Sequence, residues 1–281
     1  MRNKLLSKTL LIVGLAVVVC AFSIQAHAVT FHYSESAGFM VGTTGNLTSD
    51  DAVSPNNDIK WYQNAASPVA PAPGEFTTIA WGVSNNAAGQ LGSNPFGNPA
   101  YSGLQILGQT GSAVADGSWV TLSKIYHQNN SISDSLFALT TAVINGILTI
   151  SPADPGFFPN SDSNRVTFNE TMNVSGACVP GGPAGPACPD YFTISNSTFA
   201  DMPFTYNGGQ YAAQFQFVPI ITAQVDPVDA SGNVRIWTQE HGTSEADVQM
   251  KIVQTPEPAS LALLGLGLLG LGFIKRRRNN G

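Results

Sequence analysis

The segment Val248-Gln249-Met250-Lys251-Ile252 alternates apolar and polar residues at every step. Successive side chains of a β-strand point to opposite faces, so this segment is predicted to be a strand with one buried and one solvent-facing side. Val166-Thr167-Phe168-Asn169 alternates in the same way. Both patterns are typical of antiparallel sheets that cover a core on one face.

Segments rich in Val, Ile, Thr, Phe and Tyr recur along the chain between Gly, Pro and Asn residues. The continuous apolar run Ala142-Val143-Ile144 is typical of a central strand covered on both faces. We therefore expect an all-β domain, an antiparallel β-sandwich of about eight to ten strands. The expected strands are residues 76–83, 104–107, 119–126, 137–150, 165–174, 191–195, 210–221, 234–239 and 246–253. A long irregular segment, 39–73, is expected ahead of them.

The last residues consist of Pro256-Glu257-Pro258, an uncharged run over 259–274 and the cluster Lys275-Arg276-Arg277-Arg278. Lipid solvates an apolar helix well and guanidinium groups badly, so we predict a transmembrane helix at 259–274 with a basic tail at 275–278. At about 1.5 Å per residue the helix is roughly 24 Å long, shorter than a roughly 30 Å hydrocarbon core. Snorkelling basic side chains can close that gap.

Residues 1–28 have the composition of a signal peptide: a basic start, an apolar centre over 10–22, and Ala26-His27-Ala28. We expect signal peptidase to cut between Ala28 and Val29. Both basic clusters should stay in the cytoplasm, so the domain at 29–254 is expected to cross the inner membrane. Residues 255–281 would anchor it there before processing.

The triplet, short helix and arginine cluster resemble the PEP-CTERM sorting signal of Gram-negative bacteria, also labelled an ice-binding protein C-terminal domain. The resemblance covers residues 255–281 and implies cleavage by an exosortase, an integral-membrane transpeptidase-like enzyme. It also implies a link to exopolysaccharide and biofilm, with the mature protein at the cell surface or in the extracellular matrix. An ordinary single-span anchor is the alternative.

A second resemblance spans most of the exported domain and is to the THxN family of PEP-CTERM proteins. Its pieces, in order, are Trp81-Gly82, Ser102-Gly103-Leu104, Tyr126-His127-Gln128-Asn129, residues 166–173, the two cysteines and Asp190-Tyr191-Phe192. Tyr126 stands where the motif has threonine, so a role that needs that hydroxyl does not carry over. His127 and Asn129 do fit the motif, whose family has no assigned activity.

His127 and Asn129 are two residues apart, so in a strand they share one face. Together they could hold a cation or a sugar hydroxyl. The alternative is that they bond backbone groups at a strand end or turn.

The charge of the exported domain excludes some partners. Of 12 Lys and Arg residues, three lie in 1–28 and four in 275–278, which leaves five against 17 carboxylates and a net charge near −12. Phosphate binding needs a basic surface, so we expect no nucleic-acid partner. Divalent cations and neutral polysaccharide remain open as partners.

Cys178 and Cys188 are the only cysteines outside the leader, and they enclose a short Gly- and Pro-rich loop. An even pair in an exported chain predicts a disulfide bond. In the chain-entropy model a loop of this size contributes about 2–3 kcal/mol. A metal site is the weaker alternative, because two thiols without nearby histidines do not complete a tetrahedral shell.

We expect no catalytic residues. The three exported histidines, His32, His127 and His241, are far apart, and no His-Glu-x-x-His or Gly-x-Ser-x-Gly element occurs. Glu170 and Glu240 are the candidate pair for glycoside hydrolysis. Both are expected to be solvated or salt-bridged surface groups instead.

We also expect no metal or other cofactor, with Ca²⁺ as the alternative. Asn160-Ser161-Asp162-Ser163-Asn164 spaces oxygen donors two apart like the first half of a calcium loop, but lacks the following Gly and closing Glu. Looser clusters are Asp50-Asp51 with Asp58, and Asp226 with Asp229. Asp and Asn in loops more often form Asx-turns.

The leading hypothesis is a non-catalytic exported surface or matrix protein. Alternatives are a carbohydrate- or calcium-binding module and, less favoured, a secreted hydrolase. Sugar rings stack on exposed aromatic faces, and Trp61, in a polar stretch, is the tryptophan we expect to be exposed.

Overall fold

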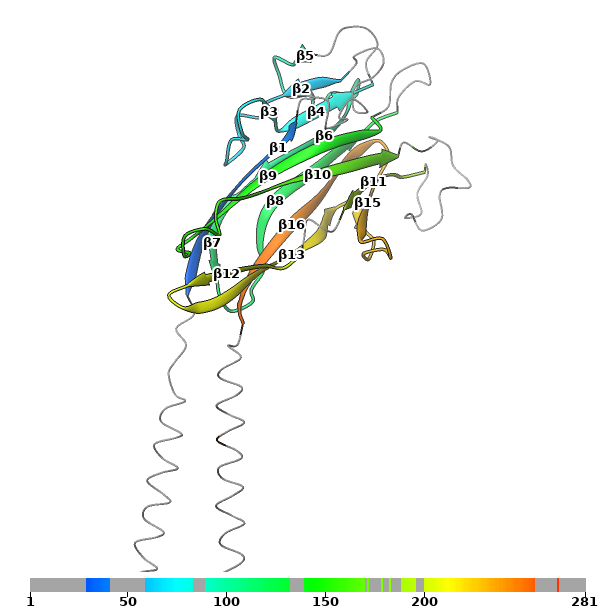
Figure 1. The fold of residues 1–281 in the computed structure, drawn as a ribbon. Coiled ribbons are helices and arrows are strands. Elements are labelled where there is room, and N and C mark those ends of the chain that lie inside the picture. The colour runs from blue at the N-terminus through cyan, green and yellow to red at the C-terminus, as the bar shows by residue number, and fades with distance from the viewer. Residues whose placement is uncertain are drawn as a thin grey trace, which may run out of the picture.

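The computed structural model describes residues 29–40, 59–82, 89–131, 139–169, 171, 178, 182, 188–195, 200–255 and 267 of the 281-residue chain. The described part contains sixteen β-strands in two eight-stranded sheets, which form the two layers seen in Figure 1. The predicted β-sandwich is confirmed. Its strands exceed the expected eight to ten because several have only two to five residues.

One sheet, sheet A, contains the central strand β9 (Thr141–Ser151) between β10 (Asn160–Asn169) and β1 (Thr30–Met40). Ala142-Val143-Ile144 lies in β9 and is buried, which confirms the expectation of a covered central strand. The remaining strands of sheet A are β3 (Glu75–Phe76) and β7 (Thr110–Val114) beside β1, and β11 (Asp190–Ser195), β15 (Asn233–Thr238) and β14 (Ala223–Val225) beyond β10.

The other sheet, sheet B, has β16 (Gly242–Gln254) near its centre. Val248, Met250 and Ile252 of β16 are buried between the sheets, while Gln249 and Lys251 are partly exposed, as the alternating pattern predicts. In spatial order, sheet B consists of β12 (Met202–Tyr206), β13 (Gly209–Ile221), β16, β8 (Val120–Asn129), β6 (Ser102–Gly108), β4 (Thr78–Trp81), β2 (Lys60–Tyr62) and β5 (Gly89–Gln90).

Aromatic side chains join the two sheets at one end of the sandwich. The ring of Phe31, from sheet A, makes edge-to-face contacts with Phe204 and Tyr211 of sheet B at centroid distances of 5.3 and 5.0 Å. All three are buried. Burial of a Phe side chain contributes about 2–3 kcal/mol, and edge-to-face pairing adds to it.

The prediction for residues 39–73 is wrong in two places. Phe39 and Met40 end strand β1, and Trp61 lies in β2, which pairs with β4. Trp61 is only 6% exposed because its ring packs against Phe76, so the expectation that it is the exposed tryptophan is also wrong. Residues 41–58 lie outside the described part of the chain.

The chain passes between the sheets after β6, where Gly108 of sheet B meets Glu35 of sheet A. The Glu35 amide donates a hydrogen bond to the carbonyl of Gln109 at 2.9 Å. A Cβ atom on Gly108 would overlap the carbonyl oxygen of Glu35. Only glycine therefore permits the two backbones to approach so closely at this corner.

The chain enters the sandwich before β1 and leaves it after β16 at the same end of the molecule (Figure 1). The carbonyl of Val29, just before β1, accepts a hydrogen bond from Ala115, and that of Ile252 accepts one from Gly117. One short turn thus holds both chain ends together. Beyond β16, the Thr255 amide still donates to the Gln210 carbonyl at 2.9 Å, so the ordered sheet reaches to the residue before Pro256.

Candidate functional site

The two residues of the Thr-His-x-Asn-like motif lie at the end of β8, and both point between the sheets. His127 is 1% exposed and Asn129 is 0% exposed. The imidazole stacks on the ring of Trp81 and makes an edge contact with Phe168, at centroid distances of 5.9 and 5.0 Å. The structure therefore places the pair on one face, as strand geometry requires, but that face is the protein interior.

The imidazole of His127 links the two sheets. Its Nδ1 lies 2.6 Å from the hydroxyl of Thr238, which donates its proton to the carbonyl of Asp190 at 3.3 Å. We therefore assign the imidazole proton to Nδ1, which leaves Nε2 as a buried acceptor with no hydrogen-bond partner among the described residues. Burial lowers the pKa of His127 to about 3, so the ring is neutral at neutral pH.

Two buried carboxyl groups lie near the motif residue Asn129. Asp190 is 0% exposed and accepts a hydrogen bond from the Thr171 amide at 2.7 Å. Burial raises the pKa of Asp190 to about 7, and the nearby Glu240 contributes in the same direction. Glu240 is also buried and its pKa is raised by burial, so the expectation that it is a surface group is wrong. Glu170 lies outside the described residues.

The amide of Asn129 lies against both carboxyl groups and lowers the pKa of each. Its two polar atoms do not reach full hydrogen-bond geometry with any described residue. We call His127, Asn129, Asp190, Thr238 and Glu240 the buried polar cluster. It connects β8 of sheet B to β11 and β15 of sheet A, and its near-zero exposure suits a structural link better than a substrate site.

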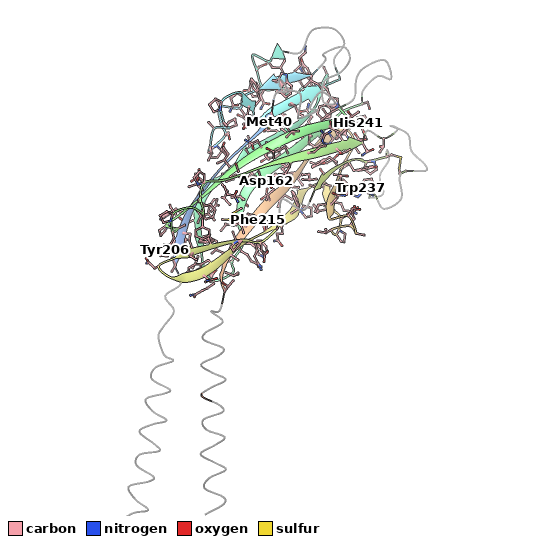
Figure 2. All side chains as sticks on the ribbon, viewed as in Figure 1. Met40, Asp162, Tyr206, Phe215, Trp237 and His241 are labelled. Atoms are coloured by element: carbon pink, nitrogen blue, oxygen red, sulfur yellow. A yellow bond between two sulfur atoms is a disulfide. The ribbon has the colours of Figure 1, made fainter. Side chains whose placement is uncertain are left out.

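The cluster lies at the end of the sandwich opposite the chain ends. Figure 2 shows Trp237 and His241, the neighbours of Thr238 and Glu240, at that end, and Tyr206 at the other. His241 has a positive φ of 58°, where the chain turns from β15 into β16. That turn carries Glu240 inward.

Gln128, between the two motif residues, has a role that sequence reasoning missed. It points away from the cluster, and its Nε2 donates to the carbonyls of Asn98 and Tyr101 at 2.9 and 2.8 Å. Its Oε1 accepts from the Gly97 amide. A buried amide with several backbone partners fixes a loop, and the only signal for it was its place inside the motif.

The disulfide bond between Cys178 and Cys188 is present as predicted. Thr171 donates from its hydroxyl to the Cys188 carbonyl at 3.0 Å, which ties the bridge to the cluster through Asp190. Within the bridged loop, Gly182 packs so closely on the Trp237 ring that a Cβ there would lie 2.8 Å from it. Gly182 therefore covers the Trp237 ring of sheet A.

The predicted calcium half-loop is not a loop. Residues 160–164 are the first five residues of β10 and pair with β9 from Leu148 to Ile144. Asp226 and Asp229 act separately: Asp226 accepts from the Trp237 indole at 2.9 Å, and Asp229 closes an Asx-turn with the Ser231 amide. Asp50, Asp51 and Asp58 lie outside the described residues. In the part of the chain that the structure describes, no three His, Cys, Asp or Glu side chains converge to hold a metal.

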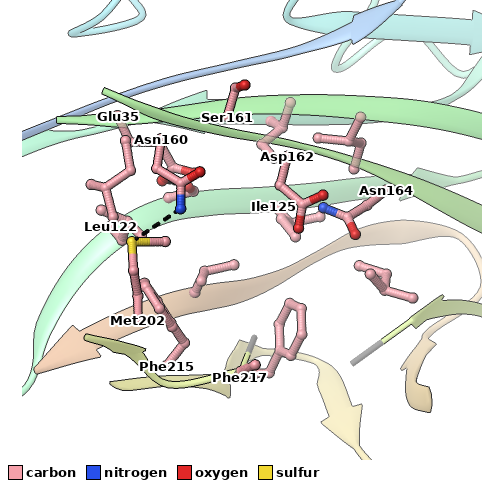
Figure 3. A pocket seen from close by; sticks show the side chains of 18 of the residues that line it. Glu35, Leu122, Ile125, Asn160, Ser161, Asp162, Asn164, Met202, Phe215 and Phe217 are labelled. Atoms are coloured by element: carbon pink, nitrogen blue, oxygen red, sulfur yellow. Dashed lines mark hydrogen bonds between the residues drawn. The ribbon is translucent and has the colours of Figure 1, made fainter. Parts of the chain in front are cut away.

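A cavity of about 370 Å³ lies between the sheets, and sequence reasoning did not anticipate it. Its walls are mainly apolar, and three acidic residues, Glu35, Asp162 and Asp201, border it. Figure 3 shows Asp162 and Asn164 of β10 pointing toward Phe217, while Ser161 points the other way. The two-residue spacing that resembled a calcium loop thus becomes, in a strand, a polar row on the cavity face of β10.

Glu35 projects from β1 and crosses to sheet B, where the Ser123 hydroxyl donates to its Oε2. Burial raises the pKa of Glu35 to about 8. The side chain is remote from the outer surface, yet part of it stays accessible because it borders the cavity. The sequence does contain a signal for the buried position of Glu35. It stands in the alternating series Phe31, Tyr33, Glu35, Ala37, whose members share the face of the strand that points to the core.

The predicted processing sites lie almost wholly outside the described residues. These are Ala28, Pro256, Glu257, Pro258, Lys275, Arg276, Arg277 and Arg278; Val29 is described and immediately precedes β1. Within the described residues, no helix has the length and apolar character needed to cross a membrane.

A family model of the PEP-CTERM protein-sorting motif matches residues 254–278. A search of curated proteins found no match to the chain. The match covers the triplet, the apolar run and the basic cluster, and begins at the last residue of β16. A sorting motif of this kind implies export to the cell surface or extracellular space. The chain thus carries a PEP-CTERM protein-sorting motif at residues 254–278.

Proposed function

We propose that the protein is a non-catalytic component of the cell surface or extracellular matrix, cleaved by an exosortase after export and associated with exopolysaccharide or biofilm. The PEP-CTERM motif at residues 254–278 is the observation that carries this proposal. The disulfide bond supports it, because such bonds persist in oxidising compartments outside the cytoplasm.

The position of the chain ends also supports it. Val29 and Thr255 leave the sandwich at the same end, so a signal peptide and a sorting helix could enter one membrane together. The buried polar cluster and the disulfide then lie at the opposite, outward end. A rigid sandwich held in this way presents its far loops to the surroundings.

The proposal that the protein is not an enzyme rests on burial. The buried polar cluster contains three groups whose pKa values are shifted by burial: His127, Asp190 and Glu240. Each of them is under 7% exposed. General acid or base catalysis needs direct reach to the substrate. Buried groups that connect sheets do not offer it, and we propose the same structural role for the THxN-like motif.

Processing is tested in the host by Glu257→Ala and, separately, by deletion of its exosortase. Either change should leave a longer species in the membrane fraction, detected with an antibody to the sandwich. Thr243→Ala, at an exposed position of β16 outside the matched motif, serves as the control and should be processed like the wild type. Equal C-terminal processing with and without the exosortase would refute the proposal.

A carbohydrate-binding module remains the second candidate. Trp119 is 36% exposed, more than any other tryptophan of the chain. The ammonium nitrogen of Lys251 lies 4.6 Å from the centre of its ring. Neutral glycans would stack on this ring, and a glycan array compared between wild type and Trp119→Ala tests this. Binding by the wild type alone would favour the module, and absence of binding would remove it.

A further inference from the structure

The cavity between the sheets has the size and lining of a small-molecule site. Binding pockets commonly enclose about 300–1,000 Å³, and this one has about 370 Å³. At roughly 30 Å³ for each water-sized atom, it holds about a dozen non-hydrogen atoms. The space opens to solvent at Asp162 and Asp201, so a ligand can reach it from outside.

The walls of the cavity are apolar and come from both sheets. Leu122 and Ile125 of β8 and Phe215 and Phe217 of β13 face Ile144 and Leu148 of β9. An aliphatic chain or single ring would contact hydrocarbon from both sheets. Such contacts favour the apolar part of a ligand by the hydrophobic effect.

One polar group sits on the inner wall. Ser123 donates to Oε2 of Glu35, the carboxyl group that borders the cavity. Oε1 lies beside Gly146, where an added Cβ would be 3.3 Å from it. A ligand atom that reaches this wall would therefore find one hydrogen-bonding oxygen in an apolar surrounding.

The mouth of the cavity is acidic. Asp162 of β10 and Asp201, just before β12, both line the cavity and are exposed to solvent. Asn160 bridges the two strands through a contact of its Nδ2 with Met202 Sδ at 3.3 Å (Figure 3). The described residues that line the cavity include no Lys or Arg, so the mouth attracts cations and repels anions.

From these observations we infer that the cavity binds a small amphiphile of about a dozen non-hydrogen atoms, with its apolar body between the sheets and a cationic, hydrogen-bond-donating head at Asp162 and Asp201. An alkylammonium has this chemistry. A fatty carboxylate of equal length has the same apolar body but the wrong charge at the mouth. The inference is independent of exosortase processing.

The test uses the full-length protein in lipid nanodiscs, with empty nanodiscs as the blank for partition into lipid. Equilibrium dialysis measures binding of radiolabelled n-decylamine, 1-decanol and decanoate. We expect n-decylamine to bind saturably at one molecule per chain. Its affinity should exceed that of decanoate at least tenfold, with 1-decanol between them.

Two pairs of variants locate the bound molecule. Ile144→Trp fills the cavity and should weaken n-decylamine binding at least tenfold, whereas Ile220→Trp, at an exposed position of β13, should not. Asp162→Asn should reduce the preference for n-decylamine over decanoate. Asp116→Asn removes the same charge in an exposed turn outside the cavity and should leave that preference unchanged.

Circular dichroism confirms that each variant is folded, and Asp162→Asn keeps the test valid if Ile144→Trp does not fold. Absence of saturable binding for all three probes would overturn the inference. So would equal binding by a folded Ile144→Trp variant. Decanoate that binds as tightly as n-decylamine would contradict the cationic head.

Discussion

Glu35 illustrates how a single inward-facing carboxyl makes folding depend on pH. Its pKa is raised by burial from 4.5 to about 8 in the folded protein. Between pH 4.5 and about pH 8, Glu35 is ionised in the unfolded chain and protonated in the folded chain. The free energy of unfolding therefore falls as pH rises from about 4.5 to about 8. Asp190 acts in the same direction, up to about pH 7.

Glu35→Gln should flatten this dependence, because the amide keeps a similar shape without a proton to lose. The decrease in unfolding free energy between pH 5 and pH 8, measured by urea denaturation, should be smaller than in the wild type. Each pH unit over which the two states differ contributes at most roughly 1.4 kcal/mol, less where cavity water screens the charge. Asp201→Asn, which removes an exposed carboxylate, is the control. If the unfolding free energy of Glu35→Gln fell with pH as steeply as that of the wild type, the raised pKa assigned to Glu35 would be contradicted.

His127 acts in the opposite pH range. Burial lowers its pKa from 6.5 to about 3, so below pH 6.5 the unfolded chain takes up a proton that the folded chain does not. Stability from this residue is therefore lost as pH falls from about 6.5 to about 3.

We expect His127→Ala to cost about 3 kcal/mol in urea denaturation, because it leaves a cavity beside Trp81 and Phe168. His127→Phe should cost less, since it keeps a ring, and should lose less stability between pH 6 and pH 4 than the wild type. If added Ca²⁺ stabilised the wild type but neither variant, the motif would be a cation site and the structural role would be wrong.

At the scale of elements, the corner between β6 and β7 depends on one glycine. Gly108→Ala should destabilise the protein by about 3 kcal/mol or more, because its Cβ would overlap the Glu35 carbonyl oxygen and neither backbone can move freely. Thermal unfolding measures the effect. Gly92→Ala, where a Cβ meets open space, is the control, and equal melting temperatures for the two variants would show that the sheets are not in close contact there.

Sequence patterns located the strands that alternate or run apolar, such as β16 and β9, because those patterns report burial directly. They failed for β1, where Glu35 interrupts the inward apolar series of Phe31, Tyr33 and Ala37 although the register is regular. They also failed for β12, although Asn207-Gly208, at φ 50° and 77°, is a strong hairpin signal. Short strands such as β2 depend on long-range pairing, which no local pattern contains.

The candidate site was predicted in part. The motif identified His127 and Asn129, and their spacing identified the shared face, but it did not reveal that this face is buried. Asp190 and the neighbouring pair Thr238 and Glu240 come from two other parts of the chain and meet the motif only through the sheet topology. The cavity has no local signal, because its walls come from strands across both sheets.

At the scale of the whole molecule, export, disulfide formation and sorting belong together. The sorting motif begins at the last residue of β16, and the chain ends leave the sandwich side by side. The domain charge near −12 at neutral pH suits an exported chain that must stay soluble. The same acidity is the reason to expect no nucleic-acid partner.

Intact-mass spectrometry of the protein from its native host tests this account most directly. We predict an exported species that begins at Val29, contains the oxidised pair Cys178 and Cys188, and lacks the basic cluster 275–278. An uncut 281-residue chain in the cytosol, with both thiols free, would contradict it.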